Sequence, residues 1–472
     1  MKKEKTQEEK YRQMVETPVS KLIPKLAVPT IISMLVTSIY NMADTFFVSQ
    51  IGTSASGAVG VIFSAMAMIQ AIGFCLGMGS GNFISRSLGN QNTEEAEKAA
   101  ATAFFTAMVI GVAVAIGGNL FIRPIVLFLG ATETIAPYAE DYAGYIFMAA
   151  PFMMCSFVMN NILRAQGNAV YAMVGITTGG ILNMLLDPLF IFAFGLGTSG
   201  AALATGLSQI ISFIILLCQC NLRKDCLSIR LREFSPTLKM YWEILYAGAP
   251  SFARQSIASV SVIILNVAAG PFGDAAIAAM SIVSRFMMFI NSALIGFGQG
   301  FQPVCGFNFG AKKYGRVLEA YWFCVKVAII MLTAMGLVFV GFSREIVTQF
   351  RREDLEVIEI GTLALRLQLI TLPIQAWIIM ANMLSQSIGY GFRATLVALG
   401  RQGIFLIPAL CIMPSIWGIR GIQFAQPVSD LCTFVLATVV IKGILRELKE
   451  MKRQEESREN GSGTNLQSEV RA

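Results

Sequence analysis

The segment that decides the fold class is residues 99–122, AAATAFFTAMVIGVAVAIGGNLFI, which contains no charged residue and lies between Lys98 and Arg123. An α-helix needs about 20 apolar residues to cross a hydrocarbon core about 30 Å thick. Similar segments recur along the chain, whereas charged residues gather in 1–25, 221–243, 344–359 and after 442. The 472 residues are 55% hydrophobic and only 14% charged, against about 25% charged in soluble proteins. The sequence therefore predicts an all-α integral membrane protein.

We predict twelve transmembrane helices in this chain. Their approximate limits are 24–49, 56–83, 97–122, 136–160, 168–193, 198–221, 243–269, 275–303, 317–342, 357–386, 391–413 and 418–443. Many of these segments contain Gly or Pro, which membrane helices tolerate better than soluble ones do.

The distribution of Lys and Arg indicates how the spans are oriented, because basic residues are retained on the cytoplasmic side. With the N-terminus inside, the outside segments hold only Arg123, Arg344, Arg351, Arg352 and Arg420, and most of the 36 basic residues lie inside. We therefore expect a multi-pass protein of the cell (plasma or inner) membrane with both termini cytoplasmic. The net charge of +7 is then a topological signal, partly directed at membrane lipids, and no nucleic-acid partner is expected.

Several classes of function are unlikely from what the sequence lacks. The chain has no histidine, its nine cysteines are scattered without a CxxC pair, and no GxSxG, Walker A or HExxH motif occurs. These absences argue against a membrane-embedded hydrolase, a metalloenzyme and ATP-driven transport. We expect a secondary active transporter rather than an enzyme, with no cofactor.

The two halves of the chain repeat each other at an offset of 221 positions. Matching residues include Pro29 with Pro250, Gly52 with Gly273, Gly89 with Gly310, Gly197 with Gly418 and Gly200 with Gly421. Because each half has an even number of spans, six, both halves enter the membrane from the same side. The axis that relates them then lies along the membrane normal. The predicted organisation is a cytoplasmic segment (1–23), an N-lobe (24–221), a cytoplasmic linker (222–242), a C-lobe (243–443) and a cytoplasmic tail (444–472), in a monomer.

Acidic residues within spans are costly and commonly functional. Asp44 lies one helical turn from Tyr40, and Asp187 lies one turn from Asn183, so each pair shares a helix face. Pro188 removes a backbone donor directly after Asp187, and Thr205 on the next span adds a hydroxyl oxygen. The sequence predicts that Asp44, Asn183, Asp187 and Thr205 bind a coupling cation, H⁺ or Na⁺, with Tyr40, Pro29 and Pro188 in support.

The C-lobe lacks these acids. The offset places Leu265 opposite Asp44, and Pro408 or Ala409 opposite Asp187. Asp430 and Arg285 each have two interpretations, a structural charge pair or a cavity lining, and the partners considered for Asp430 are Arg401 and Arg366. The predicted lining of a substrate cavity comprises Gln255, Arg285, Gln299, Gln302, Gln375 and Asp430.

Short motifs add a family resemblance over about residues 21–445. They are Pro29, the Tyr40 and Asp44 pair, Arg86-Ser87-Leu88-Gly89, Arg164-Ala165-Gln166-Gly167, Asn183-x-x-x-Asp187-Pro188, Gly200-Ala201-Ala202 with Thr205, and Gly296-x-Gly298-Gln299-Gly300 leading to Gly310-Ala311. With these the chain resembles the MATE (multidrug and toxic compound extrusion) antiporters, and within them the DinF-like branch and its MepA-type multidrug exporters. The resemblance implies that the acids matching Asp44 and Asp187, with Asn183 and Thr205, bind the coupling cation.

The resulting hypothesis is a cation-coupled multidrug antiporter that exports amphipathic, often cationic, compounds by alternating access and so confers antibiotic resistance. One alternative is a lipid-linked oligosaccharide flippase of the same superfamily, whose pyrophosphate would suit a cavity containing Arg254, Arg285, Arg366 and Arg401. A channel or a non-transporting scaffold is a further alternative, which the two-lobe repeat and the intramembrane acids disfavour.

Overall fold

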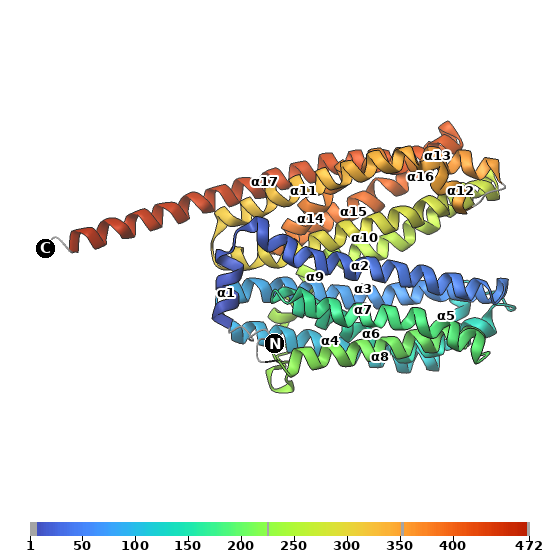
Figure 1. The fold of residues 1–472 in the computed structure, drawn as a ribbon, viewed down its shortest axis with the longest axis horizontal. Helices are drawn as coiled ribbons and strands as arrows, with labels where there is room; N and C mark the ends of the chain where they lie inside the picture. The colour runs from blue at the N-terminus through green and yellow to red at the C-terminus, as the bar shows by residue number, and fades with distance from the viewer. Residues whose placement is uncertain (1–6, 224–225, 351–353, 470–472) are drawn as a thin grey trace.

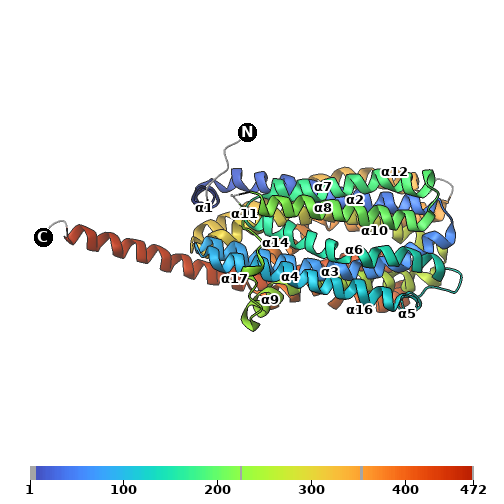
Figure 2. The same cartoon turned by 90° about the horizontal axis from the view of Figure 1, so that it is seen from below.

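The computed structural model describes residues 7–223, 226–350 and 354–469, and this part of the chain is helical throughout, with no strand. The helices run along one common direction and form two bundles that lie side by side (Figures 1 and 2). Arg351 and Arg352, counted above on the outside, lie outside the described ranges, as do five of the basic residues counted on the inside, namely Lys2, Lys3, Lys5, Lys224 and Arg471.

The N-lobe comprises the helices up to α8. They are α1 (Gln7–Glu16), α2 (Val19–Ser49), α3 (Thr53–Gly89), α4 (Thr93–Leu120), α5 (Ile122–Phe128), α6 (Ala136–Ala165), α7 (Ala169–Pro188), the π-helix η1 (Leu189–Ala193) and α8 (Gly197–Asn221).

The C-lobe follows the short 3₁₀ turn η2 (Leu231–Glu233). Its helices are α9 (Leu238–Ala269), η3 (Gly270–Phe272), α10 (Asp274–Gly310), α11 (Tyr314–Gly341), α12 (Ser343–Phe350), α13 (Leu355–Ile370), α14 (Leu372–Ser387), α15 (Gly391–Leu399), the π-helix η4 (Gly400–Ile404), α16 (Leu406–Trp417) and α17 (Ile419–Glu469).

Twelve membrane spans are found, as the sequence predicts, when one bent pair is counted as a single span. Eleven helical segments of the described chain are long and apolar enough to cross a membrane, and α13 with α14 forms a pair bent by 52°. Pro373 follows the break, where its missing N–H cannot continue the hydrogen-bond ladder of the preceding helix. The predicted fold class, two similar six-span lobes, is confirmed.

The short helices α1, α5 and α12 and the extension of α17 beyond the bundle were not predicted from the sequence (Figure 1). Helix α1 lies across one end of the bundle, which we call the tail end. Its Met14 sulfur packs over Gly167 of the N-lobe, while the Met14 carbonyl accepts a 3.2 Å hydrogen bond from Asn308 of the C-lobe. Helix α1 therefore contacts both lobes.

Near the tail end the two lobes touch backbone to backbone at positions that the repeat relates to each other. A Cβ added to Gly89, the last residue of α3, would overlap the carbonyl oxygen of Phe307, and one added to Gly310, the last residue of α10, would overlap that of Arg86. Gly89 and Gly310 are equivalent under the 221-residue offset, as are Arg86 and Phe307. The closed tail end is thus a pair of contacts related by the pseudo-two-fold axis.

Towards the opposite end, which carries α5 and α12, helices α2 and α10 separate. The hydroxyls of Ser38 and Ser292, 2.6 Å apart, form a hydrogen bond between these two helices. One turn further on the same faces, Met42 is 38% exposed and Met288 is 47% exposed. Helices α2 and α10 therefore touch at the two serines and carry exposed methionines on the side of this contact that faces away from the tail end.

Gly89→Ala is expected to disturb the tail-end contact, because its Cβ meets backbone that cannot rotate aside. Overpacking of this kind typically costs about 1–3 kcal/mol, so the thermal midpoint of the purified protein should fall. The control is Gly60→Ala on the same helix, where a Cβ meets nothing within 4 Å. Equal midpoints for the two variants would contradict the proposed contact.

Candidate functional site

Three of the four predicted cation ligands meet inside the N-lobe. Asn183 and Asp187 lie one turn apart on α7, and Thr205 lies on the neighbouring helix α8. The Asn183 amide nitrogen donates to Asp187 Oδ1 at 3.3 Å and to Thr205 Oγ1 at 3.1 Å. All three side chains are buried. The Asn183 amide therefore holds the carboxylate and the hydroxyl beside each other.

Asp44, the fourth predicted ligand, approaches this group from α2 and is half-buried. Its Oδ2 accepts a 3.4 Å hydrogen bond from the hydroxyl of Tyr142 on α6. The charges of Asp44 and Asp187 are close enough to interact with each other and with the Tyr142 hydroxyl. Tyr142 is fully buried and is the residue of this site that sequence reasoning missed. It stands next to Glu140 and Asp141 near a span end, far in sequence from either acid, so no spacing pointed to it.

Small residues on α7 allow the neighbouring helices to come close to the acids. A Cβ at Gly180 would lie 2.8 Å from Val36 and 3.1 Å from the ring of Tyr40 on α2, and one at Gly179 would lie 2.9 Å from Ser212 on α8. Helix α7 thus fits between α2 and α8, and Tyr40 is buried at that contact.

The predicted supporting prolines have different locations. Pro188 ends α7, and the wider turns of the π-helix η1 begin directly after it, an irregularity often found at functional sites. Pro29 is separated from Asp44 by 15 residues of the same helix, which is about 22 Å at 1.5 Å per residue. It lies beside Thr30, whose hydroxyl donates to the Gly296 carbonyl across the lobes at 2.7 Å. The structure therefore places Pro29 at the interlobe contact rather than at the acids.

The N-lobe cluster retains acceptor capacity. Asp44 Oδ1, Asn183 Oδ1 and Asp187 Oδ2 are buried and accept no hydrogen bond from the described residues. Carboxylate, amide and hydroxyl oxygens are hard ligands suited to Na⁺, and the carboxylates alone suffice to hold a proton. Among the described residues no group of three or more His, Cys, Asp and Glu forms a transition-metal site. The donor set fits a small hard cation.

Asp430, by contrast, is saturated with donors inside the C-lobe. Its Oδ1 accepts from Arg401 Nε at 2.9 Å and from Gln426 at 3.0 Å. Its Oδ2 accepts from the hydroxyl of Thr371 at 3.0 Å and from Gln375 at 2.8 Å. Thr371 is the residue at the bend between α13 and α14. Of the two partners considered for Asp430, the structure selects Arg401, whereas Arg366 donates to Ser343.

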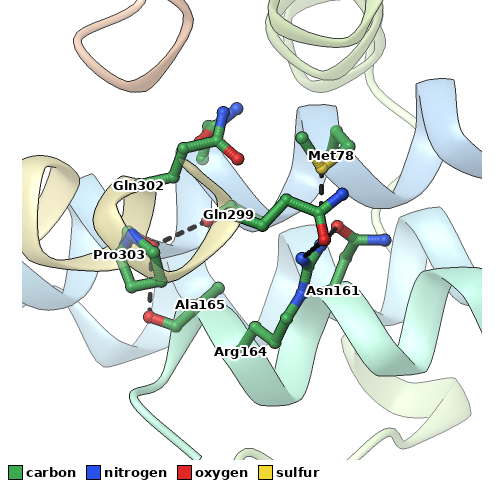
Figure 3. A pocket seen from close by; sticks show the side chains of 10 residues that line it. Met78, Asn161, Arg164, Ala165, Gln299, Gln302 and Pro303 are labelled. Carbon is green, nitrogen blue, oxygen red and sulfur yellow. Dashed lines mark hydrogen bonds between the residues drawn. The ribbon is translucent and has the colours of Figure 1, made fainter. Parts of the chain in front are cut away.

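Gln299 and Gln302 lie in the closed interlobe contact (Figure 3). The guanidinium of Arg164, in the last turn of α6, donates to Gln299 across the lobes and to Asn161 within its own lobe. All of these side chains are buried, and the space left among them is about 10 Å³, enough for about one water. Arg164 lies just beyond the predicted span 136–160, among the basic residues expected on the cytoplasmic side, and the structure buries it between the lobes.

Gln255 and Arg285, the two remaining residues of the predicted substrate cavity, lie on α9 and α10. Gln255 is half-buried, and Arg285 is exposed on the face of α10 that carries Met288 and Ser292. That face turns towards α2, because Ser292 contacts Ser38. Arg285 therefore lies in the region where the lobes separate.

Comparisons with known proteins agree with this architecture. The MatE family model matches residues 29–189 and again 250–410, two stretches displaced by the same 221 positions as the repeat. The multidrug export protein MepA of Staphylococcus haemolyticus is 26% identical over 428 residues, which are 90% of this chain and 94% of that protein. A crystal structure of MATE in complex with MaL6 superposes with a TM-score of 0.88 at 26% identity, covering 93% of this chain and 99% of that one. An outward-facing multidrug resistance MATE family transporter of the MOP superfamily gives a TM-score of 0.87 at the same identity, covering 93% and 98%.

Asp430→Asn is expected to destabilise the protein because it leaves the Arg401 guanidinium without its counter-charge. Removing one partner of a buried ion pair typically costs about 3–5 kcal/mol, so expression and the thermal midpoint should both fall. The ion dependence of transport should stay that of the unmodified protein. Asp141→Asn, at an exposed carboxylate, is the matched control. A wild-type midpoint, or an altered ion dependence, would show that Asp430 does more than pair.

Proposed function

This chain is a member of the MATE family of membrane transporters, and we propose that it exports amphipathic, often cationic, compounds in exchange for H⁺ or Na⁺. As a family member it is a multi-pass membrane transporter and not an enzyme. The relative named as a multidrug export protein supports the substrate class. The observation that carries the cation coupling is the buried N-lobe cluster of Asp44, Asn183, Asp187 and Thr205, with its unfilled acceptor oxygens.

The mechanism follows from the electrostatics of that cluster. Two carboxylates that interact in a poorly hydrated interior cannot both remain ionised at low cost, so binding one H⁺ or Na⁺ stabilises the N-lobe. The cation pulls the oxygens of α2, α7 and α8 together. In the ionised state α2 and α7 repel each other through Asp44 and Asp187. Loading and release of the cation thus change how the N-lobe helices pack, and this change drives the lobes to rock.

We assign the tail end to the cytoplasm, in the plasma or inner membrane, with both termini on that side. The basic residues of α1 and of the α17 extension support this orientation. The conformation described here is then closed to the cytoplasm and open to the outside. Inward opening has to break the link between Arg164 and Gln299 and the glycine contacts at Gly89 and Gly310.

The exposed side chains where the lobes separate suit an amphipathic substrate. Met42 and Phe46 of α2 and Met288 of α10 are soft apolar groups in this region, and flexible methionines adapt to ligands of different shape. A cationic drug and the coupling cation then compete for the negative charge of Asp44, so that loading the cation favours release of the drug. The protein acts as a monomer in this scheme.

A flippase for a lipid-linked oligosaccharide is the second candidate. It is favoured by Arg254 and Arg285, for which the described structure shows no ion-pair partner, since a pyrophosphate would supply their counter-charge. Arg401 and Arg366 no longer contribute to this argument because Asp430 and Ser343 occupy them. Dye uptake into inverted membrane vesicles separates the two candidates, because a flippase would not carry a water-soluble dye.

Asp44→Asn and Asp187→Asn are each expected to abolish cation-driven export, since each keeps the side-chain shape and removes one exchangeable charge. The measurement is the initial rate of dye uptake into inverted vesicles with proton and sodium gradients imposed separately, corrected for the amount of protein. Leu265→Ala, at the C-lobe position equivalent to Asp44, is the control and should retain ion dependence. Exchange at a near wild-type rate in Asp44→Asn, or transport that requires ATP, would refute the proposal.

Thr205→Val is expected to discriminate between the two cations. It removes one oxygen ligand without changing the shape, so Na⁺ affinity should fall about 10-fold, the equivalent of about 1.4 kcal/mol, whereas proton-driven exchange should stay near wild type because the carboxylates hold the proton. Na⁺ affinity is measured as the Na⁺ concentration that gives half the thermal stabilisation. Thr198→Val, also buried on α8, is the control. An unchanged Na⁺ affinity would exclude Thr205 as a ligand.

A further inference from the structure

The donor network around Asp430 occupies part of the C-lobe that the repeat equates with the N-lobe cation cluster. Gln426, which donates to Asp430 Oδ1, is equivalent to Thr205, and Arg401 is equivalent to Gly180, beside Tyr40. Asp430 itself lies one turn beyond Gln426 on α17. A buried carboxylate therefore stands at a related place in each lobe, although the C-lobe acid comes from a different helix than either N-lobe acid.

The two carboxylates differ in how their oxygens are occupied. Asp187 Oδ2 accepts no hydrogen bond from the described residues, and only the Asn183 amide donates to Oδ1. Each oxygen of Asp430 accepts two hydrogen bonds, and one of the four donors is the Arg401 guanidinium, which also neutralises the charge. The protein itself thus supplies Asp430 with both hydrogen-bond donors and a positive counter-charge.

Hydrogen bonds to its backbone fix the position of the segment that carries Arg401. Its carbonyl accepts a 2.5 Å hydrogen bond from Ser429, the residue before Asp430, and the next carbonyl, of Gln402, accepts a 2.5 Å bond from Ser261 of α9. Both carbonyls belong to the π-helix η4, whose wide turn leaves backbone groups free for such partners. The backbone that carries Arg401 is therefore bonded to α17, the helix of Asp430, and to α9.

We infer that Arg401 is a tethered cation that permanently occupies the C-lobe counterpart of the coupling site. It holds the C-lobe in the equivalent of the cation-loaded state, so that only the N-lobe loads and releases a cation. Removing the guanidinium converts Asp430, with Thr371, Gln375 and Gln426, into a binding site for a small free cation. The assignment of the N-lobe as the lobe that exchanges its cation rests on the proposed function, whereas occupancy of the C-lobe site by Arg401 does not.

The experiment measures binding in the C-lobe alone. Arg401→Ala is made in a chain that also carries Asp44→Asn and Asp187→Asn, and the thermal midpoint is followed as methylguanidinium or Na⁺ is added, with choline as the control cation. The midpoint should be lower than in the parent chain without Arg401→Ala. Methylguanidinium should recover most of the loss and Na⁺ part of it. Arg366→Ala, which removes an arginine bonded to Ser343, should show no such recovery.

Two further variants keep the test decisive. Adding Asp430→Asn to Arg401→Ala should abolish the response to both cations, because the carboxylate that binds them is gone. If Arg401→Ala does not fold, Arg401→Gln, which retains length and hydrogen bonding but no charge, takes its place with the same expected response. A folded variant whose midpoint ignores both cations, or a response that persists without Asp430, would overturn the inference and leave an ordinary structural ion pair. Failure of the N-lobe proposal would appear separately, as a chain with intact Arg401 whose transport responds to neither a proton nor a sodium gradient through Asp44 and Asp187.

Discussion

The rest of this structure depends on the cost of a carboxylate in an interior surrounded by hydrocarbon. Such a group is stable only when donors or a cation offset its charge. The C-lobe meets this requirement internally, with four donors on Asp430. The N-lobe leaves acceptor oxygens on Asp44 and Asp187 without a protein donor. The two lobes therefore differ in how this cost is met, and under the proposed function only the N-lobe takes up a cation from outside.

The repeat governs the backbone more strictly than the side chains. The contacts of Gly89 with Phe307 and of Gly310 with Arg86 obey the pseudo-two-fold relation closely, because they depend only on the absence of a Cβ. The polar links do not obey it: Arg164 bonds to Gln299 across the lobes, whereas its counterpart in α14, Ser385, donates to the Ala381 carbonyl within its own helix. Closure is symmetric in shape and asymmetric in chemistry.

The spans and much of the cation cluster were predictable because both follow from helical geometry. Hydrophobic length gives the spans, and spacing by one turn places Asn183 with Asp187 whatever the other helices do. Contacts between residues that are distant in the sequence were not predicted. Tyr142 reaches Asp44 from another helix, the choice of Arg401 over Arg366 depends on the π-helix at Gly400, and Arg164 is buried only because the second lobe covers it. No local pattern encodes such tertiary neighbours.

Helix α1 lies over both lobes at the tail end, held by Met14 on Gly167 and by the Asn308 bond to the Met14 carbonyl. The extension of α17 contacts the C-lobe, where Glu455 accepts from the backbone of Tyr314 at 3.1 Å. The two chain ends therefore differ as attachment points for reporter groups. A fluorophore on α17 would move with one lobe and serve as a fixed reference, whereas a fusion or label at α1 would sit on the moving seam and alter the motion that it was meant to record.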